Sequence, residues 1–252
     1  MDTVIASEPP LLATEGIAKR FGNIRALQGV DFSVCAGQIA AIVGDNGSGK
    51  TTFIKILSGN LRPDSGTIWI QGVSHAFLTP KQSLAAGIST VYQDLSLDDY
   101  RDVAANIFLG EELTYGGLFL RKKEMTRIAG DLIRDLNIGI PDITLPVGSF
   151  SGGQRQAVAV ARAVYHGKKL VIFDEPTAAM GVRESAAVLR LIRSLAQKHM
   201  AIIIICHNLH QVYEVADQVS IMRHGKILQT TSTADTPLEQ LQQMIIDADE
   251  VD

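Results

Sequence analysis

The stretch of sequence that decides the fold is Gly44-Asp45-Asn46-Gly47-Ser48-Gly49-Lys50-Thr51-Thr52. An apolar run at 39–43 comes before it, and apolar residues with helical spacing follow it at 53–57. This order predicts a strand, a glycine-rich loop and a helix, the context that supports the phosphate-binding pattern G-x-x-x-x-G-K-[ST]. The glycines let successive backbone N–H groups face inward at a helix N-terminus, which forms a cradle for a triphosphate.

Two side chains of this loop have predicted roles. Lys50 is expected to reach the β- and γ-phosphates as a compact charge, and the Thr51 hydroxyl is expected to ligate Mg²⁺. The alternative is a glycine-rich turn that only happens to contain lysine, and the strand before it and the helix after it count against that interpretation. The loop indicates that a nucleoside triphosphate binds, but it identifies neither the nucleotide nor the process that the nucleotide drives.

Composition limits the classes of protein that need to be considered. The 252 residues are 46% hydrophobic and 20% charged, so the chain can bury a core as one large domain or two small lobes. Its net charge of −4 gives no basic footprint, and we expect no nucleic-acid partner. The densest basic run, Arg121-Lys122-Lys123, is expected to be the solvated start of a helix.

Three features suggest a cytoplasmic location. Cys35 and Cys206 each lie in an apolar, strand-like stretch and are expected to be small core residues in a reducing compartment. The N-terminal residues 1–8 include acidic side chains and no long apolar region, unlike a secretory signal. The longest strongly apolar run, 201–206, is too short to cross a bilayer. Docking on a membrane protein remains compatible with these features.

Strands and helices are expected to alternate along the chain. The predicted strands are 11–21, 26–34, 67–70, 88–92, 170–173, 201–206, 218–222 and 226–230, and the predicted helices after the phosphate loop are 80–86, 103–109, 122–136, 154–166, 183–199 and 237–246. The fully apolar strands 170–173 and 201–206 are typical of a parallel sheet covered on both faces. The alternation predicts a parallel α/β sheet, with a mostly helical lobe inserted in it.

Polar side chains follow four of the predicted parallel strands. The phosphate loop comes after Val43, Gln93 after Tyr92, and the others are Asp174-Glu175 and His207. A single aspartate at a strand end is often only a helix cap, and a lone histidine is often structural. Because ligands in open α/β sheets bind at the carboxyl ends of the strands, we expect these four features to form one site.

The charges suggest a role for each of these residues. Asp174 is expected to hold Mg²⁺, mainly through water. Glu175 is the predicted base that orients and polarises an attacking water, because two adjacent carboxylates repel unless a metal or a developing charge engages one. His207 and Gln93 are expected to contact the γ-phosphate, its water or the metal. The predicted reaction is hydrolysis, driven by positioning and electrostatics.

A second helix start suggests that the site is shared. In Phe150-Ser151-Gly152-Gly153-Gln154, Ser151 is a good N-cap and the two glycines expose backbone amides. One triphosphate does not need two such cradles in one chain. A second protomer would explain the pair.

The motifs in this order resemble those of the ATP-binding cassette (ABC) ATPases over almost the whole chain. The resemblance rests on the phosphate loop, Gln93, Ser151-Gly152-Gly153-Gln154, Asp174-Glu175-Pro176-Thr177 and His207. It implies a P-loop NTPase fold in which a parallel sheet core carries an antiparallel β subdomain and an inserted helical subdomain. The chain would be a single domain, 1–252, whose RecA-like core and β subdomain occupy 1–93 and 167–252, with the helical subdomain and its signature motif at 94–166.

The resemblance also implies partners. Two copies would pair head to tail and sandwich two ATP molecules, each between the phosphate loop of one copy and Ser151 to Gln154 of the other. Phe21 would stack on adenine, and the segment after Gln93 would engage an integral membrane permease. The protein would then sit peripherally on the cytoplasmic face of the inner membrane.

Three phrases look like the monosaccharide-importer branch of the family, which serves ribose, xylose, galactose and fructose. They are Val91 to Leu95, Asn106 to Gly110 and Glu175 to Glu184. Gly181 stands where most ABC ATPases have aspartate, a trait of this branch, and Phe150 replaces the usual leucine of the signature. The single cassette is most similar to the fructose-type systems. The resemblance implies ATP-driven import of a monosaccharide through permease subunits, indirectly with a periplasmic or extracellular sugar-binding protein.

Three other functions are compatible with an ATP-binding cassette, and the sequence disfavours each to a different degree. A soluble ABC protein acting on ribosomes or DNA usually needs tandem cassettes or long coiled-coil insertions, and neither fits this length. A binding switch with little turnover is disfavoured by the presence of Glu175 and His207. A transporter for amino acids, lipids or metals is opposed only by the branch-specific phrases.

Overall fold

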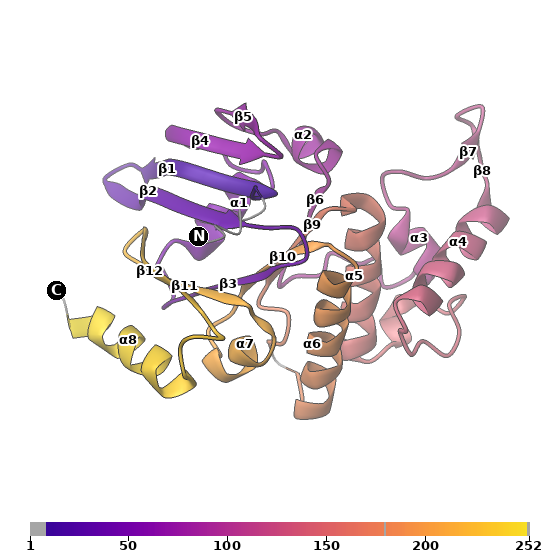
Figure 1. Ribbon diagram of the computed structural model, residues 1–252. Helices are drawn as coiled ribbons and strands as arrows, with labels where there is room; N and C mark the ends of the chain where they lie inside the picture. The colour runs from indigo at the N-terminus through magenta and orange to yellow at the C-terminus, as the bar shows by residue number, and fades with distance from the viewer. Residues whose placement is uncertain (1–8, 179, 251–252) are drawn as a thin grey trace, which may run out of the picture.

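Two stacked sheets organise the molecule, with helices on the far side of the larger sheet (Figure 1). The computed structural model describes residues 9–178 and 180–250, with side chains up to residue 247. The N-terminal segment 1–8, Ala179 of the branch-specific loop and the last two residues of the acidic tail lie outside this description, so the expectations about them stay untested.

The larger sheet has six strands. In spatial order they are β12 (Lys226–Ser232), β11 (Gln218–Arg223), β3 (Ile39–Val43), β10 (Ala201–Ile205), β9 (Leu170–Asp174) and β6 (Ile88–Val91). All neighbours pair in parallel except β12, which runs antiparallel to β11 at the edge. The carboxyl ends of five parallel strands therefore meet at one edge, as expected from the sequence.

Burial on both faces explains the continuous apolar strands. On β10, Ala201, Ile203 and Ile205 belong to the core shared with the smaller sheet, whereas Ile202 and Ile204 belong to the core under the helices. All five residues are almost fully buried. A strand with two buried faces has no reason to alternate with polar residues, which is what the run 201–206 predicted.

The smaller sheet is antiparallel and lies above the first (Figure 1). Its order is β2 (Ile24–Val34), β1 (Leu12–Phe21), β4 (Ser65–Ile70) and β5 (Val73–His75). The helix after the phosphate loop, α1 (Lys50–Leu57), packs in the same core, where Phe53 meets Phe32 edge to face with ring centroids 5.8 Å apart. This packing fixes the loop between the two sheets.

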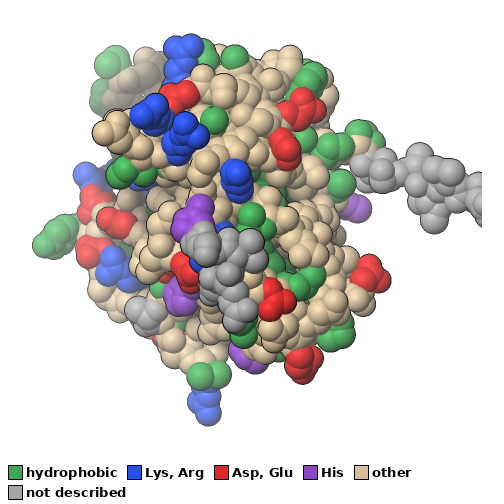
Figure 2. Space-filling model, turned by 90° about the vertical axis from the view of Figure 1, so that its left-hand side faces the viewer, with side chains coloured by type: hydrophobic (Ala, Val, Ile, Leu, Met, Phe, Trp, Pro, Cys, Tyr) green, Lys and Arg blue, Asp and Glu red, His purple; other side chains and the backbone are tan. Residues whose placement is uncertain are grey.

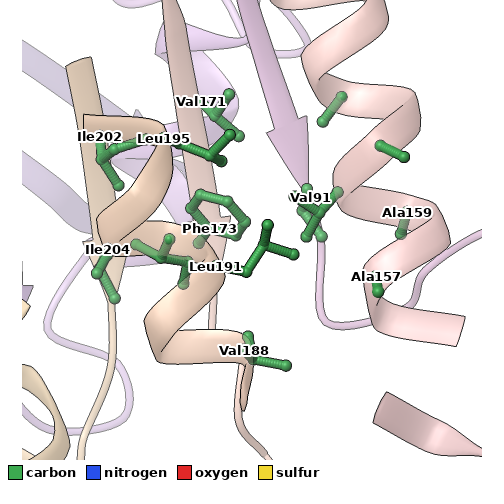
Figure 3. Close-up of a cluster of buried hydrophobic side chains, with 14 of the residues drawn as sticks. Val91, Ala157, Ala159, Val171, Phe173, Val188, Leu191, Leu195, Ile202 and Ile204 are labelled. Carbon is green, nitrogen blue, oxygen red and sulfur yellow. The ribbon is translucent and has the colours of Figure 1, made fainter. Parts of the chain in front are cut away.

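Helices cover the opposite face of the large sheet. Those that pack on its strands are α5 (Gly152–Gly167), α6 (Val182–Gln197) and α7 (Leu209–Val215). Helices α3 (Val103–Ile107) and α4 (Lys122–Asp135) pack beyond α5, away from the sheet (Figure 1), and α8 (Leu238–Glu250) packs against α7. Helix α2 (Pro80–Ala85) precedes β6. Figure 3 shows Leu191 and Leu195 of α6 packed against Phe173 of β9. These contacts hold the end of β9, where the predicted catalytic residues follow.

The predicted fold class is confirmed, and the structure adds short elements that the sequence analysis missed. These are β5, α7, a one-turn 3₁₀ helix at Val147–Ser149 and a small hairpin formed by β7 (Thr114–Tyr115) and β8 (Phe119–Leu120). Each is too short for a periodic pattern to stand out. Cys206 is buried as predicted, but Cys35 lies just beyond β2 and is partly exposed, so its assignment to the core was wrong. The division at 94–166 stays a prediction.

Candidate active site

Two glycines of the phosphate loop, Gly44 and Gly49, lie directly against the backbone of neighbouring strands. A Cβ on Gly44 would lie 2.0 Å from the Met222 carbonyl oxygen, and one on Gly49 would lie 2.7 Å from the Ala26 carbonyl oxygen. Both residues also have positive φ, which glycine adopts without strain. No side chain caps the start of α1. Its first backbone N–H groups are therefore available to an anion.

Lys50 is buried at the start of this helix. Its Nζ donates hydrogen bonds to the carbonyl oxygens of Gly44 (2.6 Å) and Asp45 (2.7 Å) and lies 3.3 Å from Ser48 Oγ. Burial lowers the pKa of Lys50, and the nearby charges of Glu175, Asp45 and Asp174 oppose this. The ammonium is thus held by the loop itself, at a point where it can exchange these contacts for phosphate oxygens.

Asp174 and Glu175 lie at the carboxyl end of β9. Glu175 has a positive φ of 50°, and its N–H donates to the Ile205 carbonyl oxygen at 2.8 Å, which ties it to the end of β10. Burial raises the pKa of Asp174, the charge of Glu175 raises it further, and Lys50 opposes the rise. A bound cation would relieve this repulsion between the carboxylates.

His207 lies beside Glu175. Its Nδ1 is 3.3 Å from Glu175 Oε1, and its side chain is 65% exposed while that of Glu175 is 19% exposed. Asn208 follows as the N-cap of α7, where its side chain accepts from the Gln211 N–H. The cap fixes the backbone on which His207 stands, so the imidazole is placed at the open side of the carboxylate.

A cleft of about 760 Å³ joins these groups. The predicted residues that line it are Asn46, Gly47, Gly49, Lys50, Thr51, Thr52, Gln93, Asp174 and Glu175. Ile205, the last residue of β10, also lines the cleft. The carboxyl ends of β6, β9 and β10 therefore meet the phosphate loop in one hollow, whose volume is typical of a small-molecule site. His207 reaches the cleft only through its contact with Glu175.

Several lining residues were missed by the sequence analysis. Residues 23–26 and Gln28 come from the start of β2, and His224 comes from the turn between β11 and β12. Gln28 Nε2 donates to the His224 carbonyl oxygen at 2.7 Å, which joins the two segments. No local pattern relates positions nearly two hundred residues apart, and the only available signal was the His224-Gly225 turn.

The donors in the cleft fit Mg²⁺ bound together with a nucleotide. Within 9–178 and 180–250 there is no group of three His, Cys, Asp or Glu residues that could hold a metal. Mg²⁺ commonly keeps several waters and takes one or two carboxylates plus substrate phosphates. The Thr51 hydroxyl, the Asp174 carboxylate and the Gln93 amide supply such a partial set.

Phe21 stands next to the cleft but does not line it. It ends β1, pairs with Ile24 across the turn, and is 48% exposed. Lys19 Nζ lies 5.7 Å from its ring centroid. Asn23 and Ile24 of the same turn do line the cleft, and the predicted stacking of Phe21 on a base stays a prediction.

The signature residues lie in a different cleft. Ser151 Oγ accepts from the Gln154 N–H at 3.3 Å, and the Ser151 N–H donates to Gln154 Oε1 at 3.0 Å, so a capping box closes the start of α5. Ser151, Gly153 and Gln154 line a hollow of about 530 Å³ between α5 and α6. Its lining shares no residue with that of the Lys50 cleft. One chain therefore keeps the two predicted halves of the site apart.

The segment after Gln93 is tied to α5. Arg162 donates to the carbonyl oxygens of Leu95 (2.6 Å) and Ser96 (2.8 Å), and Arg155 Nη2 lies 2.6 Å from Asp99 Oδ1. Two arginines of the signature helix thus hold the chain that leaves the nucleotide cleft.

Comparisons with known proteins identify a matching family and similar chains. The family model described as "ABC transporter" matches residues 27–178. The xylose/arabinose import ATP-binding protein of Sulfolobus acidocaldarius is 43% identical over 93% of both chains. The fructose import ATP-binding protein of Rhizobium meliloti is 42% identical over 88% of both. The ribose import ATP-binding protein of Yersinia pestis is 39% identical over 94% of this chain, which spans 46% of that relative.

Solved structures show the same fold. An ATP-binding cassette of an ABC transporter in its ADP conformation superposes with a TM-score of 0.82 at 27% identity, covering 95% of this chain and 96% of the other. A nucleotide-free cassette gives a TM-score of 0.83 at 26% identity over the same shares. None of the helices described for this chain is long and apolar enough to span a bilayer.

Proposed function

The chain belongs to the ABC transporter family and is an ATP hydrolase, and we propose that it drives import of a monosaccharide. The printed names of three relatives, for xylose/arabinose, fructose and ribose import, support this cargo class. The partners would be integral membrane permease subunits and, through them, a periplasmic or extracellular sugar-binding protein. The protein would work as a peripheral subunit on the cytoplasmic face of the inner membrane.

We propose a task for each residue in and beside the cleft. Lys50 and the amides at the start of α1 bind the β- and γ-phosphates, and Phe21 stacks on the adenine. Glu175 orients and polarises the attacking water. His207, whose Nδ1 lies 3.3 Å from Glu175 Oε1, contacts the γ-phosphate or that water. Thr51, Asp174 and Gln93 would hold Mg²⁺, which neutralises phosphate charge when bound.

One observation carries the proposed dimer: the signature cleft and the Lys50 cleft have no lining residue in common. A second copy, placed head to tail, would bring Ser151, Gly152, Gly153 and Gln154 of one protomer to the phosphates held by the other. The α5 start offers exposed backbone amides, which complement anionic phosphate. The arrangement would create two identical composite sites, as a two-fold dimer requires.

Mixing two inactive variants tests this arrangement. Lys50→Ala destroys one half of each site and Ser151→Arg destroys the other, so neither pure variant is expected to hydrolyse ATP. A mixed dimer contains one intact composite site, and an equal mixture should recover roughly a quarter of the wild-type rate if pairing is random and the sites are independent. The rate of phosphate release is measured for each variant and for the mixture.

The outcome discriminates clearly. Recovery on mixing requires that the two motifs come from different chains. If each variant alone kept its rate, or if the mixture stayed as inactive as its parts while dimers formed, the composite site would be wrong. Mixing Lys50→Ala with Glu175→Gln is the matched control, because both substitutions lie in the same cleft. In this mixed dimer each composite site carries one of the two substitutions, so the mixture should stay inactive.

The permease is proposed to dock beside the segment after Gln93. This segment begins the proposed helical subdomain, 94–166, and Arg155 and Arg162 bind it to the signature helix. A hollow of about 390 Å³ lies next to it and is lined by Tyr92, Leu109 and Arg162 among others. Closure of the dimer on ATP would move α5, and with it the surface offered to the permease.

Uptake measurements in the native organism test the cargo. Deleting the gene is expected to abolish high-affinity uptake of one labelled monosaccharide among xylose, arabinose, fructose and ribose, and a plasmid copy should restore it. A Glu175→Gln copy should not restore it, which ties uptake to hydrolysis. If sugar uptake persisted and amino-acid uptake fell instead, the assignment to monosaccharides would be wrong while the ATPase assignment would stand.

A further inference from the structure

A second hollow, rich in basic residues, adjoins the nucleotide cleft. It has a volume of about 490 Å³ and lies at the open ends of β1, β2 and β12. We call it the basic groove and define it by Lys19, Arg20, Arg25 and Lys226. Figure 2, which faces the side of the molecule where β1, β2 and β12 lie, shows Lys and Arg side chains gathered on its upper half.

The positive charge of the basic groove exceeds what its own acidic residue can neutralise. Among the described residues of its lining the one carboxylate is Asp64, which lies 2.7 Å from Lys19 Nζ and also accepts from the Arg20 N–H at 2.7 Å. These hydrogen bonds hold the pKa of Asp64 below its usual range, with that from Lys19 the larger cause. Arg20, Arg25 and Lys226 remain as excess charge in a chain whose net charge is −4.

The basic side chains of the groove lie close together on an exposed face. Arg20 and Arg25 occupy directly opposed positions in the β1–β2 ladder, and like charges placed opposite each other destabilise a sheet. Arg20 is further held in place by its Nε, which donates to the Gly22 carbonyl oxygen at 2.6 Å. Two guanidinium groups and a lysine around one hollow match the oxygens of a phosphate, which arginine binds in a bidentate manner.

We propose that the basic groove is a second anion site, separate from the phosphate loop, that binds a small phosphate monoester of the sugar-phosphate class. Its volume suits one small molecule, and the negative net charge of the chain disfavours a long polyanion. Ala18 and Leu27 supply an apolar floor for the carbon skeleton, and Gln28 supplies a polar side chain. The proposal goes beyond sugar import and does not depend on it.

The basic groove and the nucleotide cleft share two lining residues, Arg25 and Gln28. An anion bound in the groove would draw on the charge of Arg25, which also faces the nucleotide cleft. Gln28 is joined to the turn at His224 through its side chain and to Gly225 through its backbone N–H, at 2.7 and 2.8 Å. Occupation of one hollow should therefore weaken binding in the other, and the coupling must be reciprocal.

Calorimetric titration with glucose 6-phosphate tests the site. The protein is first saturated with Mg²⁺ and a non-hydrolysable ATP analogue, so that the phosphate loop is filled and the probe cannot bind there. We expect saturable binding of one molecule per chain. Lys226→Gln should raise the dissociation constant about tenfold, and Arg20→Gln/Lys226→Gln should abolish detectable binding.

Lys122→Gln is the matched control, because it removes one charge from another exposed lysine, far along the chain at the start of α4. It should leave the dissociation constant unchanged. Absence of saturable binding to the wild type, or an equal loss in Lys122→Gln, would overturn the proposal. Inorganic phosphate is titrated in parallel, and equal affinity for both probes would reduce the site to one for free phosphate.

A second measurement tests the coupling. Saturating glucose 6-phosphate is expected to raise the dissociation constant of the ATP analogue about fivefold in the wild type and to have no effect on Arg20→Gln/Lys226→Gln. An unchanged constant in the wild type would overturn the coupling. ATP turnover of the wild type is measured separately, so failure of the ATPase assignment would be visible on its own.

Discussion

The N-termini of α1 and α5 look alike in sequence and differ in chemistry. Glycines come just before α1 and form the first two residues of α5, yet α1 has no side-chain cap and carries buried Lys50 beside Asp174 and Glu175. In contrast, α5 is closed by reciprocal hydrogen bonds between Ser151 and Gln154. At the first helix start, burial disfavours the charges of Lys50 and Asp174, and a ligand carrying phosphate and a cation would stabilise both. At the second, the capping box pairs the N–H groups of Ser151 and Gln154 with side-chain oxygens, and the amides of Gly152 and Gly153 are the groups proposed to meet a ligand held by another chain.

Removing the proposed base at the α1 side should have the largest effect. Glu175→Gln keeps the shape of the side chain but cannot polarise water, so kcat for ATP hydrolysis should fall by about 10²- to 10⁴-fold while ATP still binds. The variant should then accumulate as an ATP-bound dimer in light-scattering measurements. Glu214→Gln, on an exposed part of α7, is the control. Turnover near the wild-type rate in Glu175→Gln would remove the base from the mechanism.

Lys50→Ala should weaken nucleotide binding strongly. The substitution removes a buried ammonium whose contacts with phosphate are charge-assisted, and a loss of about 3 kcal/mol, or roughly 150-fold in dissociation constant, is expected. Equilibrium binding of a fluorescent ATP analogue measures it. An unchanged dissociation constant would mean that Lys50 does not bind phosphate, and that the start of α1 does not differ from the start of α5 in this respect.

The raised pKa of Asp174 predicts a pH dependence at the α1 side of the site. Its pKa is raised, so as pH falls it is protonated at a higher pH than an ordinary aspartate, and Mg²⁺-dependent binding should weaken already in mild acid. Because the folded-state pKa lies above the unfolded value, the ionised carboxylate opposes folding above the folded-state pKa, and this cost is lost progressively as pH falls from the folded-state pKa to the unfolded one. Asp174→Asn should therefore stabilise the fold at neutral pH while abolishing the metal dependence. Binding titrations and denaturant unfolding across pH check both effects.

The smallest expected effect concerns the cap of α5, for which the chain offers a matched control. Thr79 and Gln82 form the same capping box at α2, outside both clefts. Ser151→Ala and Thr79→Ala should each lower the free energy of unfolding by about 1 kcal/mol. Only Ser151→Ala should also weaken ATP-dependent dimerisation. Equal dimerisation by the two variants would show that Ser151 acts only as a cap.

Much of the fold followed from local pattern. The fully apolar strands at β9 and β10 predicted a sheet buried on both faces, and the glycine-rich loop predicted the strand and helix around it. Four strand-end features were expected at one edge, and the structure brings three of them, the phosphate loop, Gln93 and Asp174-Glu175, into one cleft. The fourth, His207, is not part of the cleft lining and lies beside Glu175. The hairpin of β7 and β8 was missed although Gly116-Gly117 signals a turn, because two-residue strands carry no period.

The sequence by itself determined the α/β class, the phosphate loop and the order of the motifs, because these depend on spacing over a few residues. Only the tertiary structure decided which distant segments share a hollow. His224 enters the nucleotide cleft and Lys226 enters the basic groove because the β11–β12 turn packs against β2, where a Cβ on Gly225 would lie 2.6 Å from the Ala26 carbonyl oxygen. Such contacts arise from sheet order and burial, which no short stretch of sequence encodes.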